Sequence, residues 1–157
     1  MSGDYLYVSS YENGLYKISA KDGKTQEIYE VQADKEARND LRSFAGMKLS
    51  PDGKELVAID YNNLGHGEYL SFYNLETGEL RHISITELIE GYDVSSENVY
   101  DITWLNSETV IFAIDDSSNS NSSLWNQSYL SKDHRYIYCI SSKDMTVKWN
   151  TTLNIAE

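Results

Sequence analysis

The amino-acid sequence predicts an all-β protein assembled from repeated, four-stranded antiparallel sheets. Residues 44–85 read as four short extended segments separated by turn-forming residues. Parts of this unit recur before it and after it, and such internal copies are the strongest guide to architecture. The composition agrees, because 13 tyrosines and a single proline suit pleated, half-buried strands.

The first half of the 44–85 unit predicts a hairpin. An apolar strand at 44–49 leads into the turn Ser50-Pro51-Asp52-Gly53, where proline presets φ and glycine accepts a positive φ. The following run, 56–59, is apolar throughout and too short for a helix. We therefore expect a strand that is covered on both faces.

The second half of the unit predicts two more strands. Residues 69–73 mix apolar and aromatic side chains, and the turn at 74–78 follows them. The last strand, 80–83, alternates apolar with polar residues, which is typical of a half-exposed outer strand.

Copies of this unit lie on both sides of it. Residues 101–115 repeat 46–60 about 55 positions later, with Phe112-Ala113-Ile114-Asp115 falling on Val57-Ala58-Ile59-Asp60 without a gap. In the same way, segments on both sides repeat the strand and turn of the unit: 15–23, 70–78 and 137–145. A repeat of about 50 residues built from four strands is typical of β-propeller blades. The sequence thus predicts a β-propeller-type fold of about three four-stranded antiparallel blades.

We expect a single domain in which the first blade lacks its innermost strand. The predicted blades span residues 4–31, 44–85 and 99–152. Polar connectors at 32–43 and 86–98 separate them, and the second connector has the pattern of one helical turn from Thr86 to Ile89. A long polar insertion, 116–133, interrupts the third blade.

Three blades fall short of the roughly four that a closed propeller needs. The sequence therefore predicts an incomplete propeller or a fragment of a longer one. Open blade faces expose apolar surface and unpaired strand edges, so we expect either a homodimer or completion by the missing blades of a longer chain. Residues 153–156 are a candidate strand for completing the first blade.

Charge and apolar patterning limit the partners. The net charge of −12 disfavours nucleic acid and anionic membrane surfaces, because both attract basic patches. No apolar run approaches the ~20 residues that span a bilayer, and the start lacks the features of a signal peptide. We expect a soluble chain, cytoplasmic by default and extracytoplasmic if it derives from an exported protein. Cys139, the only cysteine, is expected to be a small buried hydrophobe.

The candidate binding residues lie in the connectors and in the loops between second and third strands, which gather on one face of a propeller. They are Arg38, Arg42, Asp60, Asn62, His66, Asp115, Asp116 and Trp125, with Asp93 and Glu97 on the same face. His66 lies between two glycines and near Asp60, which suggests a metal or acid/base role. The alternative is a polar loop residue, because His82 and His134 lie in other elements.

The insertion after the third blade's second strand offers two further readings. Asp115 and Asp116 with Asn119 and Asn121 suggest a calcium loop, although the glycine and final glutamate of an EF-hand loop are missing. A solvated loop is the alternative. Trp125 is an aromatic residue in a polar segment, so it either contacts a partner or folds back onto the blade. Trp104 and Trp149 are expected to be packing residues.

Particular motifs resemble a known kind of repeat. These are the turn Ser50-Pro51-Asp52-Gly53-Lys54 and the strand–turn–strand patterns of 7–23 and 136–149, the last ending in Trp149. With Met145 in place of a turn glycine, they resemble the bacterial quinoprotein-like and Ser-Pro-Asp-Gly-type β-propeller repeats. The resemblance implies an architecture, and it implies no cofactor.

The sequence leaves three hypotheses about function. The first is a non-catalytic binding or scaffolding module that contacts a protein or a small polar ligand. The alternative is a fragment of a propeller enzyme, a hydrolase, a lyase or a quinone-dependent oxidoreductase, whose catalytic groups lie partly outside this chain. The third is a structural piece whose partner is itself or the missing blades.

Overall fold

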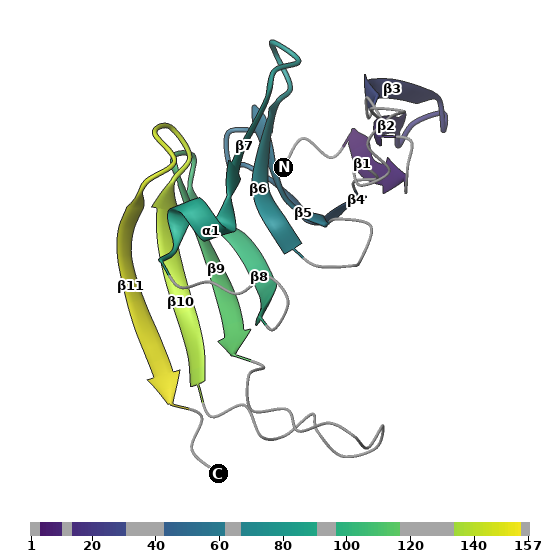
Figure 1. The fold of residues 1–157 in the computed structure, drawn as a ribbon. Helices are drawn as coiled ribbons and strands as arrows, with labels where there is room; N and C mark the ends of the chain where they lie inside the picture. Colours follow the sequence, from purple (N-terminus) through teal and green to yellow (C-terminus); the bar gives the residue numbers. More distant parts are fainter. Residues whose placement is uncertain are drawn as a thin grey trace, which may run out of the picture.

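The computed structural model describes residues 4–10, 14–30, 43–61, 67–90, 97–116 and 134–154. These residues are nearly all β-structure: three antiparallel sheets and one short helical turn (Figure 1). The predicted all-β class with blade-like antiparallel sheets is confirmed.

Each sheet is a meander whose strands pair in chain order. The first sheet contains β1 (Tyr5–Ser10), β2 (Gly14–Ser19) and β3 (Thr25–Glu30). The second contains β4 (Ser43–Leu49), β5 (Glu55–Tyr61), β6 (Gly67–Asn74) and β7 (Leu80–Ser84). The third contains β8 (Glu97–Asn106), β9 (Thr109–Asp116), β10 (His134–Ser141) and β11 (Val147–Asn154). The helical turn α1 (Ile85–Leu88) follows β7, one residue from its predicted position.

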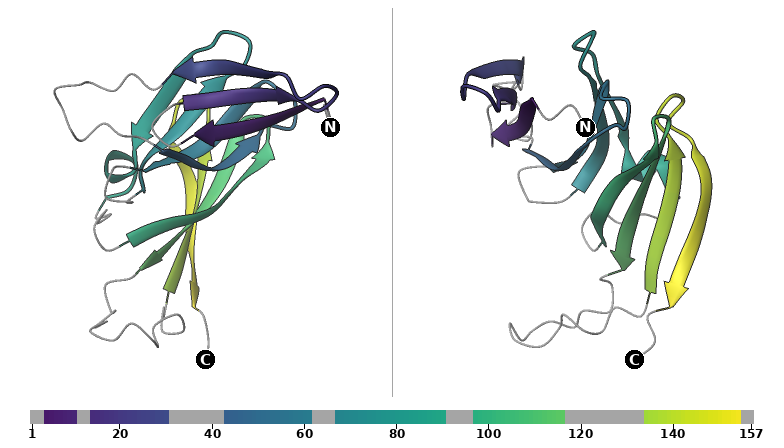
Figure 2. Two further views of the ribbon diagram at one scale, coloured as in Figure 1. Left: turned by 90° about the vertical axis from the view of Figure 1, so that its right-hand side faces the viewer. Right: turned by 180° about the vertical axis from the view of Figure 1, so that it is seen from behind.

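The second sheet lies between the other two (Figure 2). Its strand β5 contributes to both interfaces, because successive side chains of a strand point to opposite faces. Val57 and Ile59 join the cluster shared with the third sheet, whereas Leu56 and Ala58 join the cluster shared with the first. All four side chains are less than 5% exposed, which confirms that this strand is covered on both faces.

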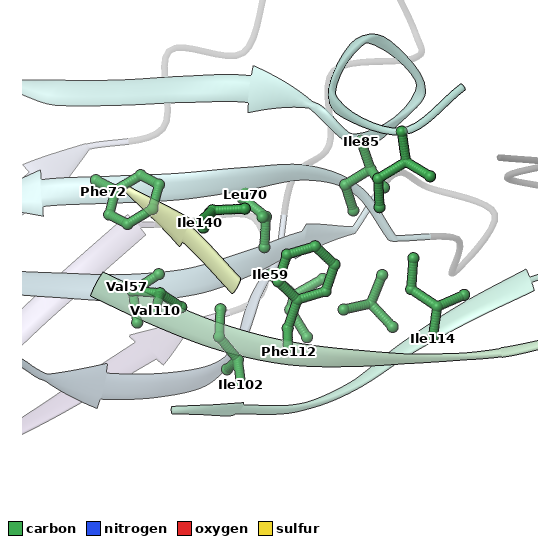
Figure 3. Packing of buried hydrophobic residues seen from close by; sticks show 12 residues of the cluster. Val57, Ile59, Leu70, Phe72, Ile85, Ile102, Val110, Phe112, Ile114 and Ile140 are labelled. Atoms are coloured by element: carbon green, nitrogen blue, oxygen red, sulfur yellow. The ribbon is translucent and has the colours of Figure 1, made fainter. Parts of the chain in front are cut away.

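The larger of the two clusters fills the space between the second and third sheets. Figure 3 shows side chains from both sheets meeting there: Val57, Ile59, Leu70 and Phe72 with Val110, Phe112, Ile114 and Ile140. Full burial of one such side chain stabilises a fold by about 1.5–3 kcal/mol. This interface is therefore the main source of stability in the described chain.

Hydrogen bonds also connect strands of neighbouring sheets. The Trp104 indole Nε1–H donates to the Lys48 carbonyl at 2.9 Å, joining β8 to β4. The Ser9 hydroxyl donates to the Phe44 carbonyl at 2.5 Å, joining β1 to β4. The expectation that Trp104 is a packing residue is confirmed, since its ring also lies edge-on to Phe72 at 6.1 Å.

Three turns share one backbone conformation. The Ser19, Asn74 and Ser141 amides each donate to a carbonyl five residues ahead, at 2.9 Å. In each turn, the residue four positions after these amides has a left-handed conformation, with φ values of 68° at Gly23, 73° at Gly78 and 54° at Met145. The segments 15–23, 70–78 and 137–145 therefore end in turns of the same geometry, and Met145 occupies the glycine position at a cost of about 1–2 kcal/mol.

The gap-free alignment of 101–115 on 46–60 holds for the inner strands and is wrong for the next ones. Gly46 and Asp101 both have positive φ, 63° and 50°, at equivalent bulges. Beyond them Lys48 pairs with Val57, whereas Thr103 pairs with Ile111. The hairpin turn of the third sheet is one residue shorter, so Val57 corresponds to Ile111. Such a shift moves every later side chain to the opposite face.

Two further expectations are corrected by the strand pairing and burial. Leu153 and Asn154 pair with Arg135 and His134 in β10, so these two residues do not complete the first sheet. Trp149 was expected to be a packing residue, yet 45% of its surface is exposed on β11.

Candidate functional site

The predicted ligand face corresponds to the end of the sheets where β1, β5 and β9 finish and β4 and β8 begin. Two hydrogen bonds bring these strand ends together: from Ser9 to the Phe44 carbonyl, and from the Tyr61 hydroxyl to the Val99 carbonyl at 3.4 Å. The strand ends are therefore adjacent, as expected for one common face.

Asp60 does not lie exposed on this face. It is the second-last residue of β5 and is 1% exposed, between the sheets. The Ser71 hydroxyl of β6 donates to Asp60 Oδ2 at 3.5 Å. Buried carboxylates require polar partners, and Ser71 supplies one for Asp60 Oδ2.

The other predicted site residues are not placed by the structure. Asp115 and Asp116 are the last residues of β9, where their backbones pair with Asn98 and Glu97 of β8. The structure does not describe the side chains of these two aspartates. The remaining predicted positions lie outside the described residues: Arg38, Arg42, Asn62, His66, Asp93, Asn119, Asn121 and Trp125. The metal and calcium readings stay predictions.

A hollow that the sequence reasoning missed lies between the two inner strands β4 and β8. It is an open cleft of about 400 Å³ lined by Gly46, Lys48, Ile59, Asp101, Ile102 and Thr103. Both strands bulge at this point, between Ala45 and Lys48 and between Tyr100 and Thr103. Bulges bend a strand and redirect its side chains, which explains why the hollow forms here.

The cleft combines an apolar floor with charged walls. Ile59 and Ile102 are buried, whereas Lys48, Asp101 and Thr103 are exposed. Gly46 keeps the floor open, because a Cβ there would lie 3.2 Å from Ile102 Cγ2. The sequence signal that could have revealed the hollow is the alignment of Gly46 with Asp101 in the repeat, because both residue types tolerate positive φ.

Titratable groups elsewhere have structural environments. The pKa values of Asp22, Asp52 and Asp144 lie below their ordinary value, chiefly because the side chains of Ser19, Ser50 and Ser141 hydrogen-bond to them. These are the carboxylates of hairpin turns; at Asp52 the Ser50 hydroxyl donates at 2.7 Å.

Cys139 is 1% exposed, which confirms the expected buried hydrophobe. Burial raises the pKa of its thiol, with Lys148 opposing the shift. A raised thiol pKa is the opposite of what a nucleophilic cysteine requires.

No three His, Cys, Asp or Glu residues within the described ranges gather in a way that suits a metal ion. No helix in these ranges combines the length and apolar character needed to cross a bilayer.

No family model matches the chain, and no curated protein matches it significantly. Among solved structures, it is similar to acylaminoacyl peptidase of Pyrococcus horikoshii, with a TM-score of 0.55 and 12% identity. That match covers 96% of this chain and 23% of the peptidase. A second similarity, to the N-terminal domain of Nup159, has 12% identity and a TM-score of 0.38, covering 94% of this chain and 45% of that one. The first similarity supports the propeller-like all-β fold and gives no information about activity. The second has too low a TM-score to support any conclusion.

Proposed function

We propose that this chain is a non-catalytic binding module that takes a small polar ligand, or a polar segment of a partner protein, between its inner strands. The observation that carries the proposal is the cleft of about 400 Å³ in which Lys48, Asp101 and Thr103 surround an apolar floor. Concave sites with a few convergent polar groups are the usual places for ligands.

The side chains of the cleft favour a ligand that carries both charges. The Lys48 ammonium has three donors, the Asp101 carboxylate only accepts, and the Thr103 hydroxyl does both. A zwitterion or a peptide with neighbouring acidic and basic groups satisfies this set. A simple anion would meet the Asp101 carboxylate beside the lysine, and such like-charge contact disfavours it.

Peptide binding has a second source of support. β4 and β8 are edge strands of their sheets, so within the described chain one side of each strand is paired with no other strand. An extended peptide segment can add to such an edge through backbone hydrogen bonds while its side chains enter an adjacent pocket.

The enzyme alternative has less support. The acid/base reading of the sequence placed His66 near Asp60, and the Asp60 side chain is 1% exposed. The similarity to a peptidase covers 23% of that protein at 12% identity, which concerns the fold alone. A binding function needs only the cleft that the described residues form.

The test is a titration followed by amide NMR with two probes: glycine as the smallest zwitterion, and a short peptide of alternating lysine and glutamate. We expect shifts at Gly46 and at residues 101–103. Asp101→Asn and Lys48→Met should each weaken binding about tenfold, the loss of one charge-assisted hydrogen bond. Asparagine keeps the tolerance for positive φ at this position.

Lys54→Met is the matched control, because Lys54 is an exposed lysine in the turn that follows β4. It should leave the affinity unchanged. Shifts that map away from the cleft, or equal loss of affinity in the control, would show that the cleft is not the binding site.

A further inference from the structure

Apolar and aromatic side chains gather on the face of the first sheet that points away from the second sheet, beside Thr25 and Glu27 of β3, whose side chains lie on the same side. The Glu27 carboxylate accepts a hydrogen bond from the Tyr16 hydroxyl at 3.1 Å. We call this face the leading face, and its apolar and aromatic members are Leu6, Val8, Tyr16 and Ile18. Strand pairing places Leu6 opposite Ile18 and Val8 opposite Tyr16, so the four side chains share one side of the sheet. Leu6 is 60% exposed.

Backbone hydrogen bonds define the counterparts of these residues in the other sheets. The amides of Ala20, Leu75 and Ser142 donate to the carbonyls of Asp4, Lys54 and Glu108 at 2.8, 2.8 and 3.0 Å. Leu6 thus corresponds to Leu56 and Val110. By the same counting, Ile18 corresponds to Tyr73 and Ile140.

Those counterparts are buried between sheets. Leu56 is 3% and Tyr73 5% exposed, where the second sheet packs on the first. Val110 and Ile140 are both 0% exposed, where the third sheet packs on the second. The leading face therefore has the pattern of a surface that another sheet covers.

The opposite end of the stack has the complementary surface. The face of the third sheet that points away from the second, here called the trailing face, carries Ile111, Ala113, Ile137, Cys139, Trp149 and Leu153. Its members Ile111 and Cys139 correspond to Val57 and Phe72, both 0% exposed against the third sheet. Trp149 and Leu153 are 45% and 48% exposed.

We propose that two copies of this chain associate head to tail, each leading face packing on the trailing face of the other copy. Inside the chain, a face of the trailing kind already packs twice on a face of the leading kind, first against second sheet and second against third. The association repeats that interface between molecules. One face of each kind is left at the two ends of the described stack.

A head-to-tail interface forms a ring when its rotation closes. Two copies would bring together six sheets of the described kind, and propellers close with about four to eight. The inference goes beyond the binding cleft, which lies within a single chain.

Charge makes the proposal sensitive to salt. Each copy has a net charge of −12, so the two copies repel each other. Most side chains of the two faces are apolar, and screening removes the net repulsion while leaving apolar burial intact. Dimerisation should therefore strengthen with sodium chloride, opposite to an interface held by ion pairs.

The experiment is sedimentation velocity on the 157-residue chain across a concentration series. We expect a species of twice the 17.9 kDa chain mass. Leu6→Glu on the leading face and Trp149→Glu on the trailing face should each raise the dissociation constant more than about tenfold. Thr77→Glu is the control, because Thr77 is exposed in the turn between β6 and β7 of the second sheet, which contributes to neither face. Circular dichroism verifies that all three variants fold.

Mixing the two face variants distinguishes the arrangement. A mixed dimer of Leu6→Glu and Trp149→Glu retains one unaltered interface, so mixing should restore part of the association. A wild-type chain that stays monomeric at all concentrations overturns the proposal. A dimer that only one of the two face variants weakens also overturns it, because such a dimer packs the same face of both copies together. A control variant that weakens association as much as the face variants overturns it as well.

Discussion

Replacing Phe112 with alanine tests the register of the third sheet. Phe112 is 0% exposed in the larger cluster and stacks on Tyr138 with ring centroids 5.6 Å apart. Its neighbour Ile111 points to the trailing face, where it is half-buried. Truncating a buried phenylalanine costs about 3–5 kcal/mol, whereas truncating a half-buried isoleucine should cost about 1–2 kcal/mol.

The assay is urea and thermal unfolding followed by circular dichroism, in a Leu6→Glu background that keeps the trailing face uncovered. For a chain of this size, 1 kcal/mol corresponds to roughly 2–4 °C in Tm, so Phe112→Ala should lower Tm by about 6–20 °C. On the same scale, Ile111→Ala should lower Tm by about 2–8 °C. If Ile111→Ala is the more damaging variant, the register is wrong and the gap-free alignment of the two repeats is right.

Three other outcomes are expected. Arg81→Met should destabilise the chain by about 1–2 kcal/mol, since Arg81 pairs with Glu55 at 2.5 Å and donates to the Lys143 carbonyl. Lys24→Met removes an exposed ion pair with Asp22 and is the control. An equal loss of stability in both variants would contradict the role of Arg81. The pKa of Asp52 is lowered in the folded chain, so the stability that its carboxylate contributes is present above the unfolded pKa and is lost as the pH falls through the folded pKa. Ser50→Ala removes the main cause of this shift, so the urea midpoint of the variant should depend less on pH below pH ~4 than that of the wild type. Cys139 should react with a thiol reagent only as fast as the chain opens; immediate reaction would contradict its burial.

Local chemistry was enough to predict the strands. The turn Ser50-Pro51-Asp52-Gly53 and the run 56–59 each determine their own conformation, and the structure has a hairpin and a doubly covered strand at those positions. The alignment of the three turns that contain Gly23, Gly78 and Met145 also followed from the sequence, and the structure has the same backbone geometry in each.

The register and the site depended on contacts that sequence does not display. The length of one turn, which differs by a single residue, decides whether Phe112 or Ile111 is the structural equivalent of Val57. Both alignments place apolar residues at alternating positions, so the sequence pattern does not distinguish them. The cleft arises from two bulges, at Gly46 and Asp101, in different sheets. Asp60 looked like a loop ligand because it precedes polar residues, yet burial between sheets decides its environment.

The two clusters that join the sheets differ in size, and this has a consequence for local unfolding. The second and third sheets share the larger cluster, whereas the first sheet is held mainly by Leu15 and by the contacts of Tyr29 with Phe44 and Tyr73. The first sheet should then open as a separate cooperative unit, with faster hydrogen exchange in β1 to β3 than in β5 or β9. Since it carries the leading face, a second copy packed there would close the weakest part of the molecule, and dimerisation would slow exchange most in β1 to β3.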